Sequence, residues 1–316
     1  MFANAGSLFG RLRLAWAPRR PSRRTLLIAV VAAGFALSGP GANAVAQNGQ
    51  PARGGAVESE GGAEDATIQA EARRLQGQYH PDPAELNASA KAALSAGRND
   101  ATVALFLNRG WAGRLSAGLE RYGTMLTAAD SQTLALAAAG IHHFGALLRR
   151  RLMEDSPRLI TLSLQAQRLT AYDQGHVVVD TPVTTGRPTL ETDVGAMRVI
   201  RKDSPWTMQS PWPKGSPNWY PDTPVRMVLW FTKTGEGLHD ASWQPDSTLG
   251  PGSQYGPFAS HGCVHVPLAA VTTLFNWAPI GTPVVVYPGN GASAASQVAQ
   301  QTVDSAGDPM SGVRGA

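Results

Sequence analysis

The pattern of apolar residues changes character once along the chain, near residue 158. Residues 67–154 are rich in Ala and Leu and have helical character over 84–96, 101–109, 112–122 and 128–153, with Asp130 placed to cap the last segment. From residue 158 onward, alternating runs at 159–164, 168–172, 176–183, 196–200, 225–231 and 284–287 predict strands, and 268–277 predicts a short helix. We therefore expect a small α-helical region at 67–155, followed by a mainly β domain of mixed sheets with a short helix at 158–288.

Two details of the β domain bear on its architecture. Asp173-Gln174-Gly175 separates two of the predicted strands and predicts a hairpin. Residues 203–224 hold six prolines, which exclude an inner strand, and four large aromatic residues, Trp206, Trp212, Trp219 and Tyr220. A loop of this length is usually functional or disordered, and its aromatic content favours packing. Either the loop covers a site as a lid, or its tryptophans fill the edge of the domain's own core.

The first 46 residues carry the basic charge of the chain, because they contain six arginines and no acidic residue. Without them the chain has 21 basic and 23 acidic residues, so the formal charge of +4 gives no support to nucleic-acid binding. The arginines precede an apolar run at 26–37 that is too short to span a bilayer, and Ala42-Asn43-Ala44-Val45-Ala46 offers cleavage sites. This order predicts an export signal peptide at 1–46, with Arg23-Arg24 similar to a twin-arginine signal; an uncleaved membrane anchor is the alternative.

The remaining segments are less informative. Residues 47–66 are rich in Gly, Ala and acids and predict a flexible linker, whereas 289–316 are small and polar and predict a disordered tail. In the helical region, His142 and His143 are adjacent and point about 100° apart on a helix, which disfavours a joint metal site. No other feature there indicates a role.

Cys263 is the single cysteine, so an exported chain cannot form an internal disulfide. It lies in the densest group of reactive residues, Ser260-His261-Gly262-Cys263-Val264-His265, with His239-Asp240 upstream. If residues 262–266 are extended, His261, Cys263 and His265 share one face of the strand. Three interpretations stay open on spacing alone: a thiol nucleophile with a histidine base, a zinc site, or a small buried cysteine without chemistry.

The motif Ser260-His261-Gly262-Cys263, with His239 placed 24 residues before the cysteine, resembles the active-site signature of the L,D-transpeptidase catalytic domain, also called the YkuD domain. Residues 160–172 are similar to the opening hairpin of that domain, and 183–188 are similar to its next segment. The resemblance covers about 158–288 and implies an L,D-transpeptidase-like fold. This chain departs from the pattern at His265, where the family usually has Arg or Asn, at Asp240, and at residues 189–193.

The resemblance implies that Cys263 attacks the carbonyl between a diamino acid and a terminal D-alanine in a peptidoglycan stem peptide. A thioester would form, and an amine of a second stem would then attack it and close a cross-link. By the same resemblance His239 is the general base and later the acid, Asp240 orients it, and His261 polarises the substrate in the pocket. The Gly262 and Cys263 amides form the oxyanion hole. Substrate contacts are expected from Ser260, His265, Trp206, Trp212, Trp219 and Tyr220.

Several expectations about partners follow from this interpretation. The expected partners are peptidoglycan stem peptides, and carbapenem-type β-lactams are the expected covalent inhibitors. We expect no metal or other cofactor and no nucleic acid. Membrane contact is expected only through an uncleaved leader. We expect the protein to be located in the periplasm or at the cell wall, because the reaction needs no nucleotide. Water as the acceptor would instead make the chain an L,D-carboxypeptidase. A non-catalytic wall-binding module and a zinc enzyme are the alternatives from other classes.

Overall fold

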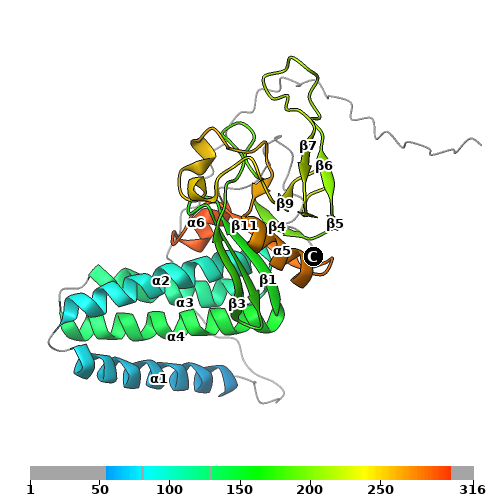
Figure 1. Cartoon of the computed structure of the whole chain (residues 1–316). Helices are drawn as coiled ribbons and strands as arrows, with labels where there is room; N and C mark the ends of the chain where they lie inside the picture. The colour runs from blue at the N-terminus through cyan, green and yellow to red at the C-terminus, as the bar shows by residue number, and fades with distance from the viewer. Residues whose placement is uncertain (1–54, 80–81, 128–129, 300–316) are drawn as a thin grey trace, which may run out of the picture.

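The computed structural model describes residues 55–79, 82–127 and 130–299, with the backbone only for 55–61. Four long helices come first, followed by a domain of mixed β-sheets (Figure 1). The fold class predicted from the sequence is therefore confirmed. The predicted signal peptide at 1–46 lies outside the described residues. None of the helices described is long and apolar enough to cross a membrane.

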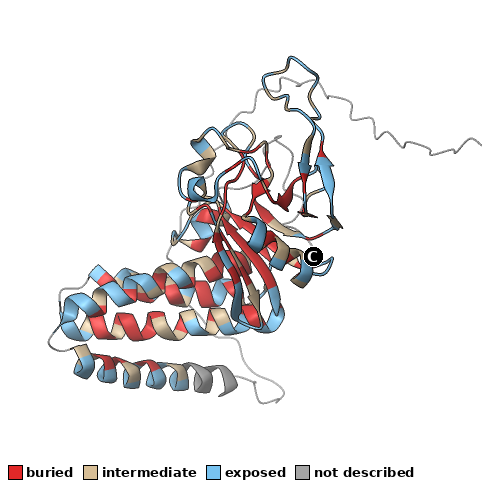
Figure 2. Cartoon of the chain, viewed as in Figure 1, coloured by how far each residue is buried: buried red, intermediate tan, exposed pale blue. Residues whose placement is uncertain are grey.

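The helical region consists of α1 (Gly55–Tyr79), α2 (Pro83–Phe106), α3 (Ala112–Gly123) and α4 (Ser131–Asp155), with a short 3-10 turn at Thr124–Thr127. The carboxylate of Asp130 accepts a hydrogen bond from the Thr133 amide at 2.7 Å, which confirms the predicted cap of α4. Figure 2 shows that α2 and α4 turn buried faces toward each other. The apolar core between the helices includes Ile68, Leu75, Leu94, Leu119, Ile141 and Leu148.

The predicted linker at 47–66 is wrong over its second half, because residues 55–66 form the beginning of α1. Alanine and glutamate are good helix formers, and α1 contacts α4 through a hydrogen bond between Glu64 and His143, with Oε1 and Nε2 3.1 Å apart. The predicted tail at 289–316 is likewise wrong for 289–299. There the Gly291 amide donates to Asn99 of α2 at 2.7 Å, and α6 (Ala294–Ala299) follows.

The larger sheet has the strand order β3-β2-β1-β11-β4. Its strands are β1 (Arg158–Ser163), β2 (Arg168–Asp173), β3 (His176–Pro182), β4 (Gly195–Arg198) and β11 (Pro283–Tyr287). Strands β1 and β11 are parallel and the other neighbours are antiparallel. Asp173 pairs with His176 across Gln174 and Gly175, both of which have positive φ, so the predicted hairpin is confirmed.

The second sheet, of order β10-β9-β8-β5, carries the candidate site. It is formed by β5 (Arg201–Asp203), β8 (Val228–Trp230), β9 (Gly237–His239) and β10 (Val264–His265). Strands β6 (Trp206–Met208) and β7 (Thr223–Val225) form a separate two-stranded ribbon at the base of the proline-rich loop. Two 3-10 turns, Asp246–Thr248 and Ser253–Tyr255, precede β10, and α5 (Leu268–Trp277) follows it.

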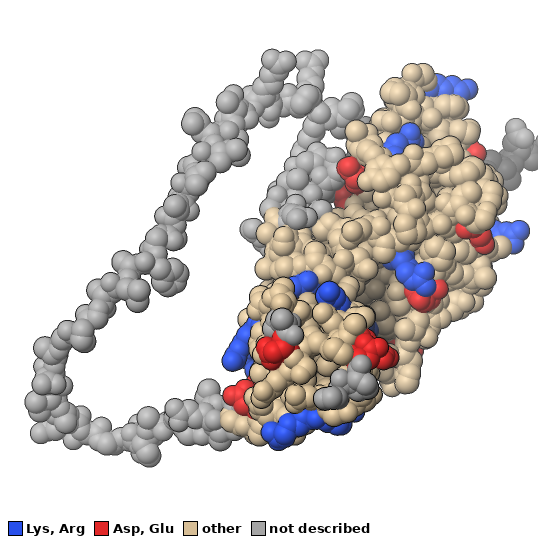
Figure 3. Space-filling view, turned by 90° about the vertical axis from the view of Figure 1, so that its left-hand side faces the viewer, with Lys and Arg blue, Asp and Glu red and all other residues tan. Residues whose placement is uncertain are grey.

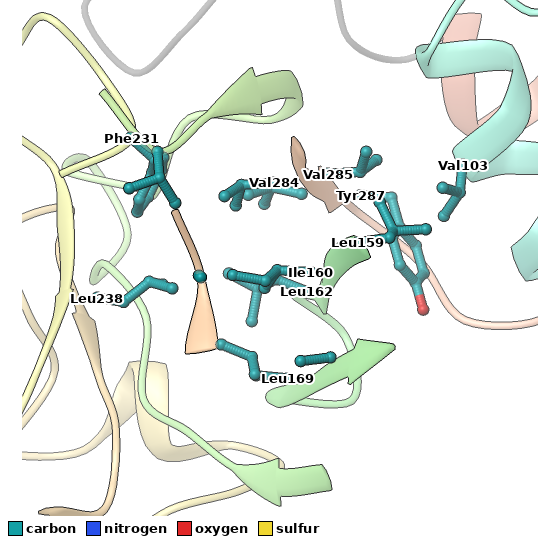
Figure 4. Close-up of a cluster of buried hydrophobic side chains, with 14 of the residues drawn as sticks. Val103, Leu159, Ile160, Leu162, Leu169, Phe231, Leu238, Val284, Val285 and Tyr287 are labelled. Atoms are coloured by element: carbon teal, nitrogen blue, oxygen red, sulfur yellow. The ribbon is translucent and has the colours of Figure 1, made fainter. Parts of the chain in front are cut away.

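The helical region and the sheets share one apolar core. Side chains from the ends of α2 and α4, namely Val103, Phe106 and Leu152, belong to the same buried cluster as the strand residues Leu159 and Val284. Figure 4 shows Val103 next to the sheet residues Leu159 and Tyr287. The two parts are therefore packed as one body. On the face drawn in Figure 3, basic and acidic side chains are scattered without a continuous basic patch.

Candidate active site

The segment that carries Cys263 is a tight turn that depends on glycine. Gly262 has φ +120°, and a Cβ atom there would lie 2.8 Å from Oε1 of Glu236. A side chain at this position would therefore meet both backbone strain and a steric clash. The buried hydroxyl of Ser260 accepts from the Gly262 amide at 3.1 Å and donates to the Cys263 carbonyl, which closes the turn.

The pairing of β9 with β10 brings the predicted base to the nucleophile. These short strands are parallel, with His239 opposite His265 and Leu238 opposite Val264. The pairing places His265 on the same face as His239, and Cys263 directly precedes β10 in the chain. The rings of His239 and His265 have centroids 5.1 Å apart. The sheet thus gathers the thiol and two imidazoles from segments about two dozen residues apart in sequence.

The hydrogen bond of His239 fixes its tautomer. Its Nδ1 lies 2.8 Å from the backbone carbonyl oxygen of Asp240. A carbonyl only accepts, so Nδ1 carries the proton and Nε2 keeps its lone pair. Burial lowers the pKa of His239, although the Asp240 carbonyl works in the opposite direction. The structure therefore presents a neutral imidazole of the correct tautomer.

Asp240 orients His239 through its backbone and not through its side chain. Its carboxylate Oδ1 accepts from the amides of Arg226 and Met227, at 2.8 and 3.0 Å. These bonds hold the turn that leads into β8. The predicted orienting contact of Asp240 with His239 is therefore made by the backbone carbonyl.

The surroundings of the Cys263 side chain favour the thiol over the thiolate. Burial raises its pKa to about 12; a hydrogen bond with the Gly237 backbone acts against this, and the nearby Glu236 carboxylate adds to it. The thiol donates to the Gly235 carbonyl, with Sγ and O 3.7 Å apart. A base is thus needed at the moment of attack, because no preformed thiolate is available.

Residues 262–266 are not extended throughout, so the strand face predicted to carry His261, Cys263 and His265 together does not form as expected. The strand begins only at Val264, and the positive φ of Gly262 turns the preceding residue away. The His261 ring packs against Trp212 and Tyr220, with centroids 5.5 and 5.0 Å apart, and its Nε2 contacts the Arg187 guanidinium. Burial, followed by the Arg187 charge, lowers the pKa of His261 to about 4.

Two predicted contacts of the motif are also corrected. The Gly262 amide donates to Ser260 and is not directed at a substrate, which leaves the Cys263 amide as the candidate oxyanion donor. Ser260 was expected to contact substrate, but it is buried and both functions of its hydroxyl are engaged within the turn.

His265 lies buried behind the site and is held by residues that the sequence did not indicate. Its Nδ1 is 2.7 Å from Oε1 of Gln244, whose amide nitrogen donates to the Thr184 hydroxyl at 2.8 Å. Burial, with the neighbouring His239 and His261, holds the pKa of His265 well below its usual range. Trp243 covers both rings, 6.1 Å from His239 and 5.4 Å from His265. No motif or spacing singled out Trp243, Gln244, Arg187 or Glu236.

The aromatic loop divides into a base and a tip. At the base, Trp206 packs on Trp230 with centroids 5.9 Å apart, beside a small cluster formed by Met208, Val225 and Val228. At the tip, Trp212 and Tyr220 lie against His261, and the phenol of Tyr220 donates to the Gln209 carbonyl at 3.0 Å. Trp219 is partly exposed beside Lys214. Only the tip residues Trp212 and Tyr220 reach the motif.

The described residues offer no metal site at this place. Among them, no group of three or more His, Cys, Asp or Glu side chains is arranged to hold an ion. The Nδ1 atoms of His239 and His265 are both engaged in hydrogen bonds within the protein. The arrangement is instead that of a thiol, an oriented base and a turn that fixes the backbone beside the thiol.

Comparisons with known proteins identify the domain. Residues 157–286 match the family model of YkuD, the L,D-transpeptidase catalytic domain, and no curated protein matches the chain. Among solved structures, an L,D-transpeptidase of Enterococcus faecium is 30% identical over 42% of this chain and 50% of its own, with a TM-score of 0.37. The catalytic domain of an E. faecium L,D-transpeptidase is 31% identical over 41% of this chain and 95% of its own, with a TM-score of 0.36.

The same E. faecium domain acylated by ertapenem is 29% identical over 42% of this chain and 97% of its own, with a TM-score of 0.36. The chain spans half the length of the first E. faecium structure. The match to the family model coincides with the residues that form the two sheets and the Cys263 turn. Residues 157–286 of this chain thus belong to the L,D-transpeptidase catalytic domain family.

Proposed function

We propose that the chain is an exported peptidoglycan L,D-transpeptidase that cross-links stem peptides through a thioester on Cys263. One observation carries the proposal: a half-buried thiol directly precedes β10, the strand that pairs with β9 at His239, and the Nδ1–H of His239 donates to a backbone carbonyl. This is the arrangement of an activated nucleophile with an oriented base. The site needs no nucleotide, which suits work outside the cytoplasm.

The first half of the reaction forms the acyl-enzyme. The Cys263 sulfur attacks the carbonyl carbon before the terminal D-alanine of a donor stem, while His239 Nε2 takes the thiol proton. The Cys263 amide donates to the oxyanion of the tetrahedral intermediate. His239 then gives its proton to the leaving amine as the carbon–nitrogen bond breaks, so D-alanine departs and a thioester remains.

The second half transfers the acyl group. An amine of a second stem attacks the thioester carbonyl and loses a proton to His239. The carbon–sulfur bond breaks, the sulfur takes that proton, and the new amide is the cross-link. Because burial raises the pKa of Cys263 and lowers that of His239, an ion pair before attack is disfavoured, and proton transfer is expected to accompany attack.

The tip of the aromatic loop supports transfer over hydrolysis. Trp212 and Tyr220 cover His261 next to the motif, and burial, with a smaller effect of Cys263, raises the pKa of Tyr220 to about 12. Apolar rings near a thioester exclude water and favour an amine acceptor. Water as the acceptor would give an L,D-carboxypeptidase with the same residues.

A mass measurement tests the proposal. The purified chain is incubated with ertapenem, and a second sample receives a defined stem tetrapeptide with and without an acceptor amine. We expect a single covalent adduct on Cys263 with ertapenem, and loss of D-alanine with a cross-linked product when the amine is present. The Cys263→Ser variant should fold and form no adduct, because the hydroxyl is scarcely ionised.

Other results would point elsewhere. A hydrolysed tripeptide as the sole product, with the amine present, would make the chain a carboxypeptidase. A folded wild-type chain without adduct or turnover would support a non-catalytic wall-binding module.

A further inference from the structure

A second concave site lies beside the active-site turn and takes no part in the chemistry above. It is a pocket of about 610 Å³, lined by residues of four segments. Gln165 and Gln167 follow β1, Gly186 and Glu191 come from the loop after β3, Gln254 and Tyr255 lie in a 3-10 turn, and Pro288 follows β11. Its volume is in the range of small-molecule sites in proteins.

The walls of this pocket are fixed by one buried side chain. Gln167 is fully buried, and its amide nitrogen donates to the Leu164 carbonyl and the Thr185 hydroxyl, both at 2.7 Å. Its oxygen accepts from the Thr185 amide at 2.8 Å and from the Ser253 hydroxyl at 3.3 Å. Three of the four segments are thus joined before any ligand arrives, which reduces the ordering cost of binding.

The fourth segment of the lining, which follows β11, is also held by a hydrogen bond. The Gln165 oxygen accepts from the Asn290 amide at 2.6 Å, which fixes the chain after Pro288. On the opposite side, the Thr192 hydroxyl accepts from the Gly186 amide and donates to the Gly262 carbonyl, at 3.0 and 2.7 Å. The pocket wall is therefore bonded directly to the turn that holds Cys263.

The lining has one polar group with no partner. Oε1 of Gln254 is buried and forms no hydrogen bond with the described residues. A buried acceptor without a partner costs stability, so its presence at a pocket indicates a donor supplied from outside. The terminal amide torsion of Gln is soft, so this group can reorient at low energetic cost.

The rest of the lining suits a sugar more than a peptide. Tyr255 is 74% exposed at the rim, and an open aromatic ring offers a flat apolar face with a polar tip. Glu191 is the charged residue of the lining, which includes no Lys or Arg among the residues described. Such a pocket disfavours stem peptides, which carry carboxylates, and favours a neutral ligand with hydroxyl and amide donors.

We propose that this pocket binds a neutral saccharide, namely the N-acetylated amino-sugar units of a glycan strand. The assignment to wall glycan rests on the proposed function, because a glycan strand is what carries the stem peptides. Binding here would hold the strand beside the Cys263 turn while a stem enters the active site.

Binding of a peptide-free tetramer of N-acetylglucosamine to the full chain tests the proposal, measured by calorimetry and by saturation-transfer NMR. We expect Tyr255→Ala and Gln254→Leu each to weaken binding about three- to ten-fold. The control is Ile280→Ala, which truncates an exposed apolar residue outside the pocket and should bind as the wild type does. Tyr255 is so exposed that its truncation should leave the melting temperature unchanged.

Acylation by ertapenem is measured on the same variants and separates this proposal from the proposed function. The proposal is supported if every variant is acylated normally and the tetramer binds more weakly to Tyr255→Ala and Gln254→Leu. Absence of tetramer binding in a wild-type chain that is acylated overturns it. Tetramer binding that neither substitution weakens also overturns it. Binding of a free stem tetrapeptide that depends on Tyr255 would overturn it as well.

Discussion

The Cys263 thiol is expected to react slowly with a small alkylating reagent at neutral pH, despite its place in a catalytic motif. The reason lies in its surroundings, since burial raises its pKa to about 12 and Glu236 adds a negative charge nearby. Neutral His239 offers no positive charge to hold a thiolate, because burial lowers its pKa as well. The resting site should therefore contain a thiol beside an imidazole and not an ion pair.

The size of the effect follows from these values. An ordinary thiol of pKa about 8.5 is roughly 3% ionised at pH 7, whereas a thiol of pKa about 12 is ionised to about 10⁻⁵. The folded chain thus has about three thousand-fold less thiolate than the unfolded chain. A thiolate of higher pKa is intrinsically more nucleophilic, by roughly 40-fold over this range. The net expectation is alkylation about 10²-fold slower when folded.

Because Cys263 is the single cysteine, the assay reports on one atom. The rate of iodoacetamide addition is followed by intact mass from pH 5 to pH 10, for the folded chain and for the chain in urea as its matched control. The folded rate should rise with pH throughout, without a plateau. A plateau beginning near pH 6, or a folded rate equal to the unfolded rate at pH 7, would show a preformed thiolate–imidazolium pair and refute this reasoning.

Three further predictions concern the turn, the buried charges and the loop. Gly262→Ala should lower stability by about 1–3 kcal/mol in thermal unfolding and remove ertapenem acylation, because its φ is +120° and its Cβ would meet Glu236. Burial raises the pKa of Asp100 to about 6 despite its ion pair with Arg149, so the folded chain binds this proton more tightly than the unfolded chain. Protonation of Asp100 therefore adds to the free energy of unfolding below about pH 4, and this contribution of roughly 3 kcal/mol is lost as the pH rises through 6. In urea titrations, the Asp100→Asn variant should not show this decrease in the free energy of unfolding. Replacing residues 210–218 with a short Gly/Ser link should leave the melting temperature nearly unchanged and shift products from cross-linked to hydrolysed; a large fall in melting temperature at a constant product ratio would make the loop part of the core.

The local patterns of the sequence predicted the elements well. Alternation after residue 158, the cap at Asp130 and the Gln174-Gly175 turn each depend on a few neighbouring residues, and the structure has all three. The start of α1 at 55–66 escaped prediction because its Gly-, Ala- and acid-rich composition is also that of a linker, and the contact of Glu64 with His143 of α4 is not visible in the composition.

The site was predictable in its residue types and less so in its hydrogen bonds. The spacing of His239 and Cys263 indicated a base and a nucleophile, but the parallel pairing of β9 with β10 is a tertiary feature. Partners such as Gln244 and Arg187 lie far from Cys263 in sequence, and the sequence assigned neither of them a role in the site. The positive φ of Gly262 interrupts the extended backbone expected at 262–266, and an alternating strand pattern alone does not predict that interruption.

The core shared by helices and sheets has an evolutionary consequence. Val103, Phe106 and Leu152 fill space between the strands, so a chain shortened to residues 157–286 would expose a hollow where three large side chains had been. Losing such side chains costs on the order of 2–5 kcal/mol each, comparable to the whole stability of many domains. The helical region is therefore not expected to be a detachable module of this chain. Substitutions at the ends of α2 and α4 must remain compatible with the strands, and the two parts are bound to diverge together.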